Sequence, residues 1–134
     1  MDHVNNEHKD AIYERFEAYW KQIALRFRDY DEHLLFAGMN EVQDVERDVN
    51  NGATGNPIPE NFTIHNHLNQ MFVNIVRATG GRNYYRHLVV QSYVTGIGYA
   101  LSELKYPSDV VENRTFLEVH YYDPWEFCIK EEDY

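Results

Sequence analysis

The sequence is poor in cysteine and in long apolar runs, and each shortage excludes a class of protein. Cys128 is the one cysteine, so no internal disulfide can form, and we expect this side chain to fill a small apolar core position. No apolar segment approaches the roughly 20 residues that would span a bilayer, and no cationic stretch followed by an apolar run opens the sequence. We therefore expect no membrane segment and no signal peptide in this chain.

Basic residues are also few: 12 Lys and Arg stand against 22 Asp and Glu, for a formal net charge of −10. This balance argues against nucleic acid or an anionic membrane surface as a partner. What the sequence does have is enough length and apolar content for one compact domain, which we assign to residues 1–134. Aromatic residues make up 15% of it, and such rings pack cores or stack on sugars.

Helical and strand patterns alternate along the chain. They predict helices at residues 10–28, with Asp10 as the N-cap, 63–79 and 97–104. They predict strands at residues 34–39, 87–94 and 114–122, with a long loop at 43–61. The first strand lacks polar alternation, which is typical of a strand buried on both faces. Strands that alternate with helices indicate a parallel sheet.

Each predicted strand begins apolar and ends polar. The polar ends are Asn40-Glu41, Gln91-Ser92-Tyr93 and His120-Tyr121-Tyr122. In parallel α/β folds, the carboxyl ends of the strands meet at the edge of the sheet where ligands bind. We therefore expect these three groups to converge on one site.

Glu41 is the candidate for acid/base chemistry in that site, with Asn40 beside it to hydrogen-bond a substrate hydroxyl. Taken alone, the Asn-Glu pair is more often a solvated turn at a strand end. A histidine such as His120 is, by default, a hydrogen-bonded structural residue. The convergence of three strand ends is what favours a functional site.

Three stretches resemble the cellulase family, family five of the glycoside hydrolases, and within it bacterial endoglucanases. They are WKQIALRFRDYDEHLLFAGMNE, NQMFVNIVRATGGRNYYRHLVVQSYV and FLEVHYYDPWEF. The resemblance extends from about residue 10 to residue 127 and implies a (β/α)8 TIM barrel. This chain would be a partial barrel of three parallel strands and three helices, from the third helix to the sixth strand.

The resemblance also implies roles for single residues. Glu41 matches the general acid/base, Asn40 its hydroxyl-binding neighbour, and His120 and Tyr122 the His-x-Tyr pair that lines the cleavage subsite. Trp125 is either a platform for sugar stacking or an aromatic packed under a loop. The implied activity is retaining hydrolysis of β-1,4-glucan, with no cofactor or metal, by a parent enzyme that is extracellular or periplasmic.

Two departures from the family pattern qualify this expectation. Val42 follows Glu41 where the family usually has proline. More important, the family's nucleophilic glutamate ends a seventh strand, and this sequence offers no counterpart, because Glu126, Glu131 and Glu132 do not sit at a strand end. Since retaining hydrolysis needs two carboxyl groups, we predict little or no hydrolysis by the isolated chain.

Other functions remain open at this point. A non-catalytic β-glucan-binding remnant would bind oligosaccharides without turnover, and an acidic interaction protein would rest on net charge alone. Three parallel strands also leave unpaired sheet edges, which predicts either self-association or a place within a longer polypeptide.

Overall fold

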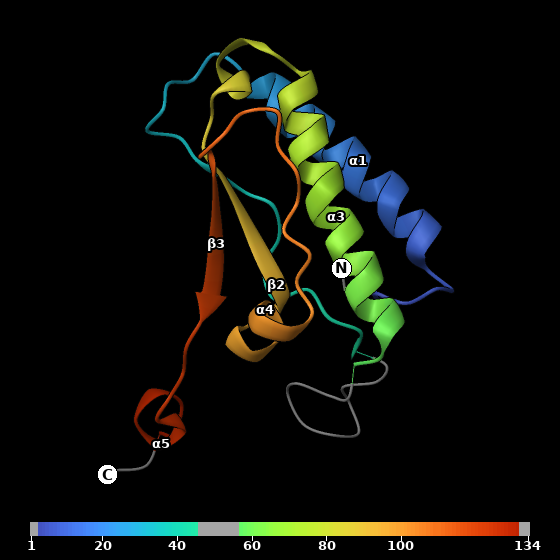
Figure 1. Cartoon of the computed structure of the whole chain (residues 1–134), viewed down its shortest axis with the longest axis vertical. Helices are drawn as coiled ribbons and strands as arrows, with labels where there is room; N and C mark the ends of the chain where they lie inside the picture. The colour runs from blue at the N-terminus through green and yellow to red at the C-terminus, as the bar shows by residue number, and fades with distance from the viewer. Residues whose placement is uncertain (1–2, 46–56, 132–134) are drawn as a thin grey trace.

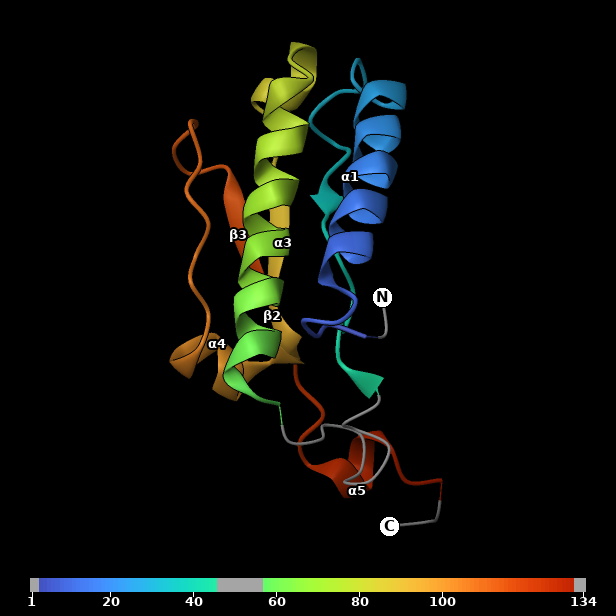
Figure 2. The same ribbon diagram turned by 90° about the vertical axis from the view of Figure 1, so that its right-hand side faces the viewer.

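The structure is a computed structural model and describes residues 3–45 and 57–131 (Figure 1). Two long helices, α1 (Lys9–Arg26) and α3 (Pro59–Ala78), lie side by side over one face of a three-stranded sheet (Figure 2). The sheet contains β1 (Phe36–Ala37), β2 (Leu88–Gly96) and β3 (Thr115–His120), in that order. Both strand pairs are parallel, which confirms the predicted sheet.

Three short elements complete the described chain. A 3₁₀ turn, η1 (Gly81–Tyr84), precedes β2, and helix α4 (Ile97–Ser102) follows it, close to the predicted third helix. Helix α5 (Trp125–Cys128) was not predicted and lies beyond the carboxyl end of β3 (Figure 1).

The predicted helix starts need correction. Helix α1 has His8 as its N-cap, while Asp10 lies in the first turn, where its charge favours the helix dipole. Helix α3 begins at Pro59 and not at Thr63, because the fixed φ of proline suits the first helical position. Most of the predicted loop, residues 46–56, lies outside the described residues.

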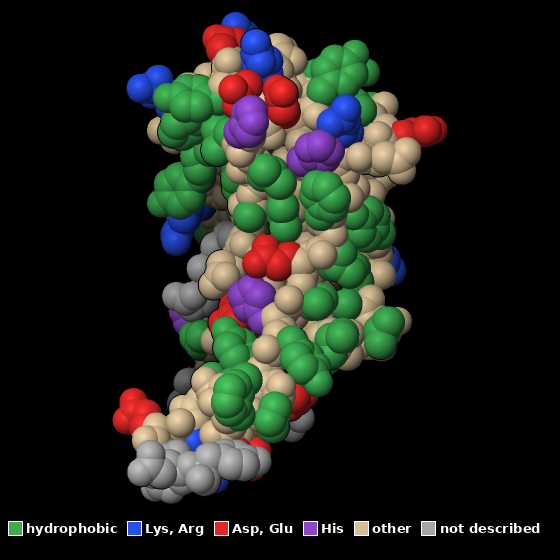
Figure 3. All heavy atoms as spheres, turned by 90° about the vertical axis from the view of Figure 1, so that its left-hand side faces the viewer, with side chains coloured by type: hydrophobic (Ala, Val, Ile, Leu, Met, Phe, Trp, Pro, Cys, Tyr) green, Lys and Arg blue, Asp and Glu red, His purple; other side chains and the backbone are tan. Residues whose placement is uncertain are grey.

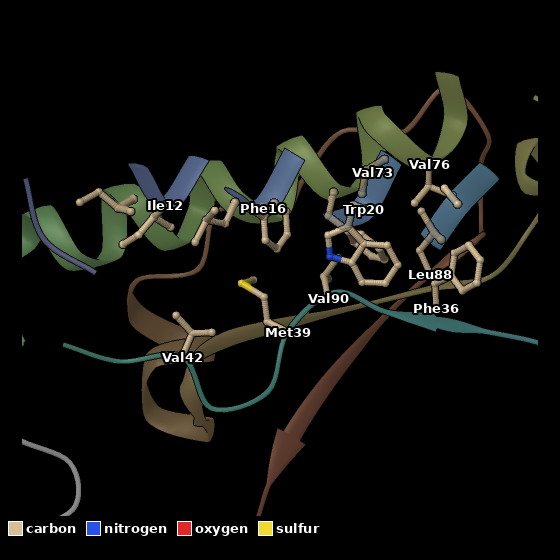
Figure 4. Packing of buried hydrophobic residues seen from close by; sticks show 14 of the residues in the cluster. Ile12, Phe16, Trp20, Phe36, Met39, Val42, Val73, Val76, Leu88 and Val90 are labelled. Carbon is tan, nitrogen blue, oxygen red and sulfur yellow. The ribbon is translucent and has the colours of Figure 1, made fainter. Parts of the chain in front are cut away.

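The hydrophobic core fills the space between the two long helices and the sheet (Figure 4). Trp20 of α1 and Phe72 of α3 meet at its centre, with ring centroids 4.5 Å apart. The indole Nε1 of Trp20 donates a hydrogen bond of 3.1 Å to the carbonyl of Gly38. A Cβ on Gly38 would lie 2.9 Å from the Phe72 ring, so only glycine lets the chain pass here. These contacts fix the segment that follows β1 against the core.

The opposite face of the sheet is not covered by a helix layer in the described part of the chain, and hydrophobic side chains gather on it (Figure 3). The prediction that residues 34–39 are buried on both faces is therefore wrong: Leu35 is 46% exposed and Ala37 is exposed, while Phe36 is buried. Cys128 is also exposed, contrary to the expected core position. None of the described helices combines the length and apolar character that crossing a membrane requires.

Candidate functional site

Glu41 lies just beyond β1 on a segment that the core holds on both sides. Met39 and Val42 are buried, so the backbone on either side of Glu41 is anchored. The carbonyl of Val42 accepts a hydrogen bond of 3.2 Å from the backbone N–H of Val94, which ties the segment to the end of β2. Glu41 has a φ of +45°, a conformation uncommon for a residue other than glycine. This backbone projects its carboxylate past the edge of the sheet.

His120 ends β3, opposite an irregular stretch of β2. The pairing runs from Gln91–Glu118 to Gly96–His120, with a register shift between the two pairs. Within that shift, Val94 and Thr95 have φ values of +47° and +53°, which are strained for β-branched residues. The extra length in β2 brings a glycine, with no side chain, opposite the imidazole of His120.

The two predicted residues meet directly. The Nδ1 atom of His120 lies 2.5 Å from Oε1 of Glu41, although 79 positions separate them in the sequence. The Nε2 atom of the same ring lies 3.1 Å from Oε1 of Glu118. The carboxylates of Glu41 first and Glu118 second favour the charged imidazole and raise the pKa of His120.

A hollow of about 550 Å³ opens beside this contact. Four of the five predicted site residues line it, namely Glu41, His120, Tyr122 and Trp125. The rings of His120 and Tyr122 are nearly perpendicular, at 89°, with centroids 6.3 Å apart. Trp125 is 50% exposed, so its ring is available to a ligand. The fifth residue, Asn40, is exposed next to Glu41, and its role as a hydroxyl-binding group stays a prediction.

Sequence reasoning missed Glu118, which lies behind this site, and did not foresee that Gln91, expected at this edge, would bind it. Glu118 and Gln91 lie opposite each other on β3 and β2, and Nε2 of Gln91 donates a hydrogen bond of 3.0 Å to Oε2 of Glu118. This amide first, and His120 after it, lower the pKa of Glu118 despite partial desolvation. Residues two apart on a strand share one face, so the spacing of Glu118 and His120 was a signal that could have been used.

The site is therefore an acid/base arrangement of carboxylates around an imidazole, next to aromatic rings. Within residues 3–45 and 57–131, no group of three or more His, Cys, Asp or Glu side chains has an arrangement that could hold a metal ion. Proton transfer by a positioned carboxylate is the chemistry that these side chains offer.

Comparison with known sequences points to one family. The profile of the Cellulase family (glycosyl hydrolase family 5) matches residues 1–133. A xyloglucan-specific endo-β-1,4-glucanase from Bacteroides ovatus is 55% identical over 133 residues, which is 99% of this chain and 26% of that protein. Endoglucanase A from Paenibacillus barcinonensis is 34% identical over 96% of this chain and 33% of its own length.

Solved structures agree with the sequences. A Bacteroides ovatus GH5 xyloglucanase in complex with a XXXG heptasaccharide superposes with a TM-score of 0.88 at 53% identity. The match covers 99% of this chain and 28% of that one. A GH5-4 broad-specificity endoglucanase from Ruminococcus champanellensis with bound cellotriose gives 0.83 at 40% identity, over 92% of this chain and 35% of that one. The chain thus spans about a quarter to a third of the length of these relatives.

Proposed function

Because the chain belongs to the cellulase family, glycosyl hydrolase family 5, we propose that it carries the acid/base side of a retaining site for β-1,4-glucan. The observation that carries this proposal is the 2.5 Å contact between Glu41 and His120, at the mouth of a hollow that Tyr122 and Trp125 also line. Two separate strand ends supply the acid and the imidazole, as a site built at the carboxyl edge of a parallel sheet requires.

Each residue has a part in the proposed reaction. Glu41 gives its proton to the glycosidic oxygen and later takes one from water. Since His120 engages Oε1 of Glu41, we assign Oε2 to the glycosidic oxygen. Asn40 holds a hydroxyl of the sugar, and Tyr122 lines the point of cleavage. The exposed indole of Trp125 stacks on a sugar ring.

A retaining site also needs a nucleophilic carboxylate about 5–5.5 Å from the acid. In the family this glutamate ends a seventh strand, whereas β3 is the last strand of the sheet in the described residues. Glu118 does not take that place, because it lies within β3 and is hydrogen-bonded to Gln91 and His120. We therefore propose that the isolated chain binds glucan but hydrolyses it little or not at all.

Two tryptophans make binding measurable. Trp20 is 8% exposed in the core, whereas Trp125 is 50% exposed at the hollow, so a ligand should change the emission of Trp125 alone. Titration with cellotetraose and with a xyloglucan heptasaccharide should give a saturable fluorescence change. The change should disappear in Trp125→Phe and persist in Trp20→Phe. No change with either sugar would contradict the proposal.

Turnover is a separate measurement. Release of reducing sugar from carboxymethyl-cellulose that is abolished by Glu41→Gln would show a working active site and overturn the expected lack of hydrolysis. Binding without turnover also fits the second candidate, a non-catalytic β-glucan-binding remnant. The exposed strand end and Trp125 favour that candidate over an acidic interaction protein, for which net charge is the only support.

Two further expectations belong to the same proposal. The apolar side chains of β3, among them Phe116 at 50% exposure, lie on an edge strand, so we propose self-association through this edge. Light scattering should show a mass above that of a monomer, and Phe116→Lys should lower it.

A polymeric substrate places the parent enzyme outside the cytoplasm, in the extracellular space or the periplasm, which cell fractionation tests.

A further inference from the structure

His120 faces a carboxylate at each of its ring nitrogens. Nδ1 contacts Glu41 at 2.5 Å and Nε2 contacts Glu118 at 3.1 Å. An ionised carboxylate only accepts hydrogen bonds, and a neutral imidazole has a single N–H to donate. With Glu118 ionised and the acid proton of Glu41 on Oε2, the two contacting oxygens only accept, so the ring satisfies both contacts only as imidazolium, with a proton on each nitrogen.

Glu118 is itself held in place from the other side. Its Oε2 accepts a hydrogen bond from the amide of Gln91, whose side chain is buried within the sheet. The backbone carbonyl of Gln91 accepts a hydrogen bond of 2.8 Å from Nδ2 of Asn69 on α3. A continuous series of contacts therefore runs from α3 through β2 and β3 to His120 and ends at Glu41.

We propose that Glu118 is a positioning residue for Glu41: its carboxylate holds Nε2 of His120, keeps the ring doubly protonated and directs Nδ1–H at Glu41. The role in catalysis rests on the proposed function, since it needs Glu41 to be the acid/base. The contact between Glu118 and His120 does not rest on the proposed function, because it is a property of the folded chain. The raised pKa of His120 and the lowered pKa of Glu118 have the directions that such a contact requires.

The competing explanation is that Glu118 only satisfies the buried amide of Gln91. The two explanations differ in what happens to the charge on His120. Among the described residues, the titratable side chains facing the ring or its hollow are Glu41 beyond β1, Glu118 on β3, Tyr122 beyond β3 and Tyr99 on α4. Removal of the Glu118 charge should therefore lower the pKa of His120 directly.

The first measurement uses the unchanged chain and depends on no variant. Nitrogen-15 NMR of the histidine rings near pH 7 should find protons on both nitrogens of His120, at a pH where an ordinary histidine, with a pKa of about 6.5, is mostly neutral. A ring that has one bare nitrogen at this pH would overturn the proposal.

The second measurement compares matched variants. Glu118→Gln keeps the size and hydrogen-bonding capacity of the side chain but removes its charge, and it should lower the pKa of His120 by about one pH unit. Glu112→Gln, the same exchange at an exposed position before β3, should leave that pKa unchanged. Glu41→Gln should lower it by at least as much as Glu118→Gln. An unchanged pKa in a folded Glu118→Gln chain would leave Glu118 as a structural residue only.

The sugar titration separates this inference from the proposed function. If Glu118→Gln lowers the pKa of His120 but no glucan oligosaccharide binds the chain, the contact is real and the function is wrong. If oligosaccharides bind but the pKa of His120 does not respond to Glu118→Gln, the function stands and the inference is wrong.

Discussion

The half of the chain under the long helices and the half beyond β2 are built from similar residues but have different neighbours. In the packed half, formed by α1, α3, β1 and β2, Leu68, Phe72 and Val90 are fully buried. In the open half, formed by β3 and α5, Phe116, Leu117 and Trp125 remain between 41% and 50% exposed. Apolar character alone therefore does not decide burial here, because a second layer has to be present to bury it.

The candidate site lies on the boundary of these two halves. Glu41 belongs to the packed half through its buried neighbours Met39 and Val42, whereas His120 ends the last strand of the open half. The acid is thus held by the core, and the imidazole is held mainly by the polar contacts that run through Glu118 and Gln91. Loss of core packing and loss of these polar contacts should therefore change the stability of the chain in separable ways.

The largest expected difference between the halves is in core packing. Phe72→Ala removes a buried ring that touches Trp20 and lies against Gly38, and it should lower the free energy of unfolding by about 3–5 kcal/mol. Phe116→Ala, the same exchange at a ring that is 50% exposed in the open half, should cost about 1 kcal/mol or less. Urea unfolding followed by circular dichroism measures both, and equal losses would contradict the division into two halves.

The second difference is between two histidines whose pKa values shift in opposite directions, His65 in the packed half and His120 in the open half. His65 of α3 is buried in the packed half, and burial lowers its pKa from 6.5 to about 4. The unfolded chain takes up this proton first, so the stabilising contribution is complete above pH 6.5 and is lost as the pH falls toward 4. The loss over this range should be about 3 kcal/mol.

The test compares slopes of stability against pH. In His65→Leu, the free energy of unfolding should fall less steeply between about pH 6.5 and pH 4.5 than in the unchanged chain. If His65→Leu keeps the slope of the unchanged chain, His65 takes up its proton in the folded chain without penalty.

The convergence of the segments after β1 and β3 could be predicted from the sequence, because parallel strands bring their carboxyl ends to one edge. Ser92 and Tyr93 of β2 were expected there too, but they are buried and do not line the hollow. Glu41, His120, Tyr122 and Trp125 line one hollow although they are far apart in sequence. The pairing of Gln91 with Glu118 could not be predicted, since it depends on the register of two strands and on a shift within β2. Residue patterns specify which face a side chain takes, but not which residue lies opposite it.

The backbone at the end of β2 was also beyond prediction. Val94 and Thr95 are β-branched and disfavour a positive φ, so their local preferences argue against the conformation that they adopt. Tertiary contacts impose it: Tyr93 is buried, and its hydroxyl accepts a hydrogen bond of 2.8 Å from the backbone N–H of Asp44. Strain of this kind is concentrated where strands meet functional sites.

Burial was predicted wrongly at two positions for a related reason. Leu35 and Cys128 are apolar and were expected to be covered, yet both are exposed. The apolar run around Leu35 is typical of a strand in a complete barrel, in which strands absent from the described sheet would face it. A sequence pattern thus reports the environment in which it was selected, which can be larger than the chain itself.

The smallest expected effect has the opposite sign and belongs to His120. Glu41 and Glu118 raise its pKa in the folded chain above the unfolded value of 6.5, so its stabilising contribution is complete below pH 6.5 and is lost as the pH rises through the folded pKa. Because the ring is partly exposed, solvent screens the interaction, and the contribution should be about 1 kcal/mol or less. The stability difference between the unchanged chain and His120→Gln should therefore shrink from about pH 6 to pH 8, whereas that for His65→Leu should stay level over the upper part of this range. A difference for His120→Gln that grows with pH would mean that the imidazole is bound as the neutral form, and the boundary between the two halves would then lack the charge that we assign to it.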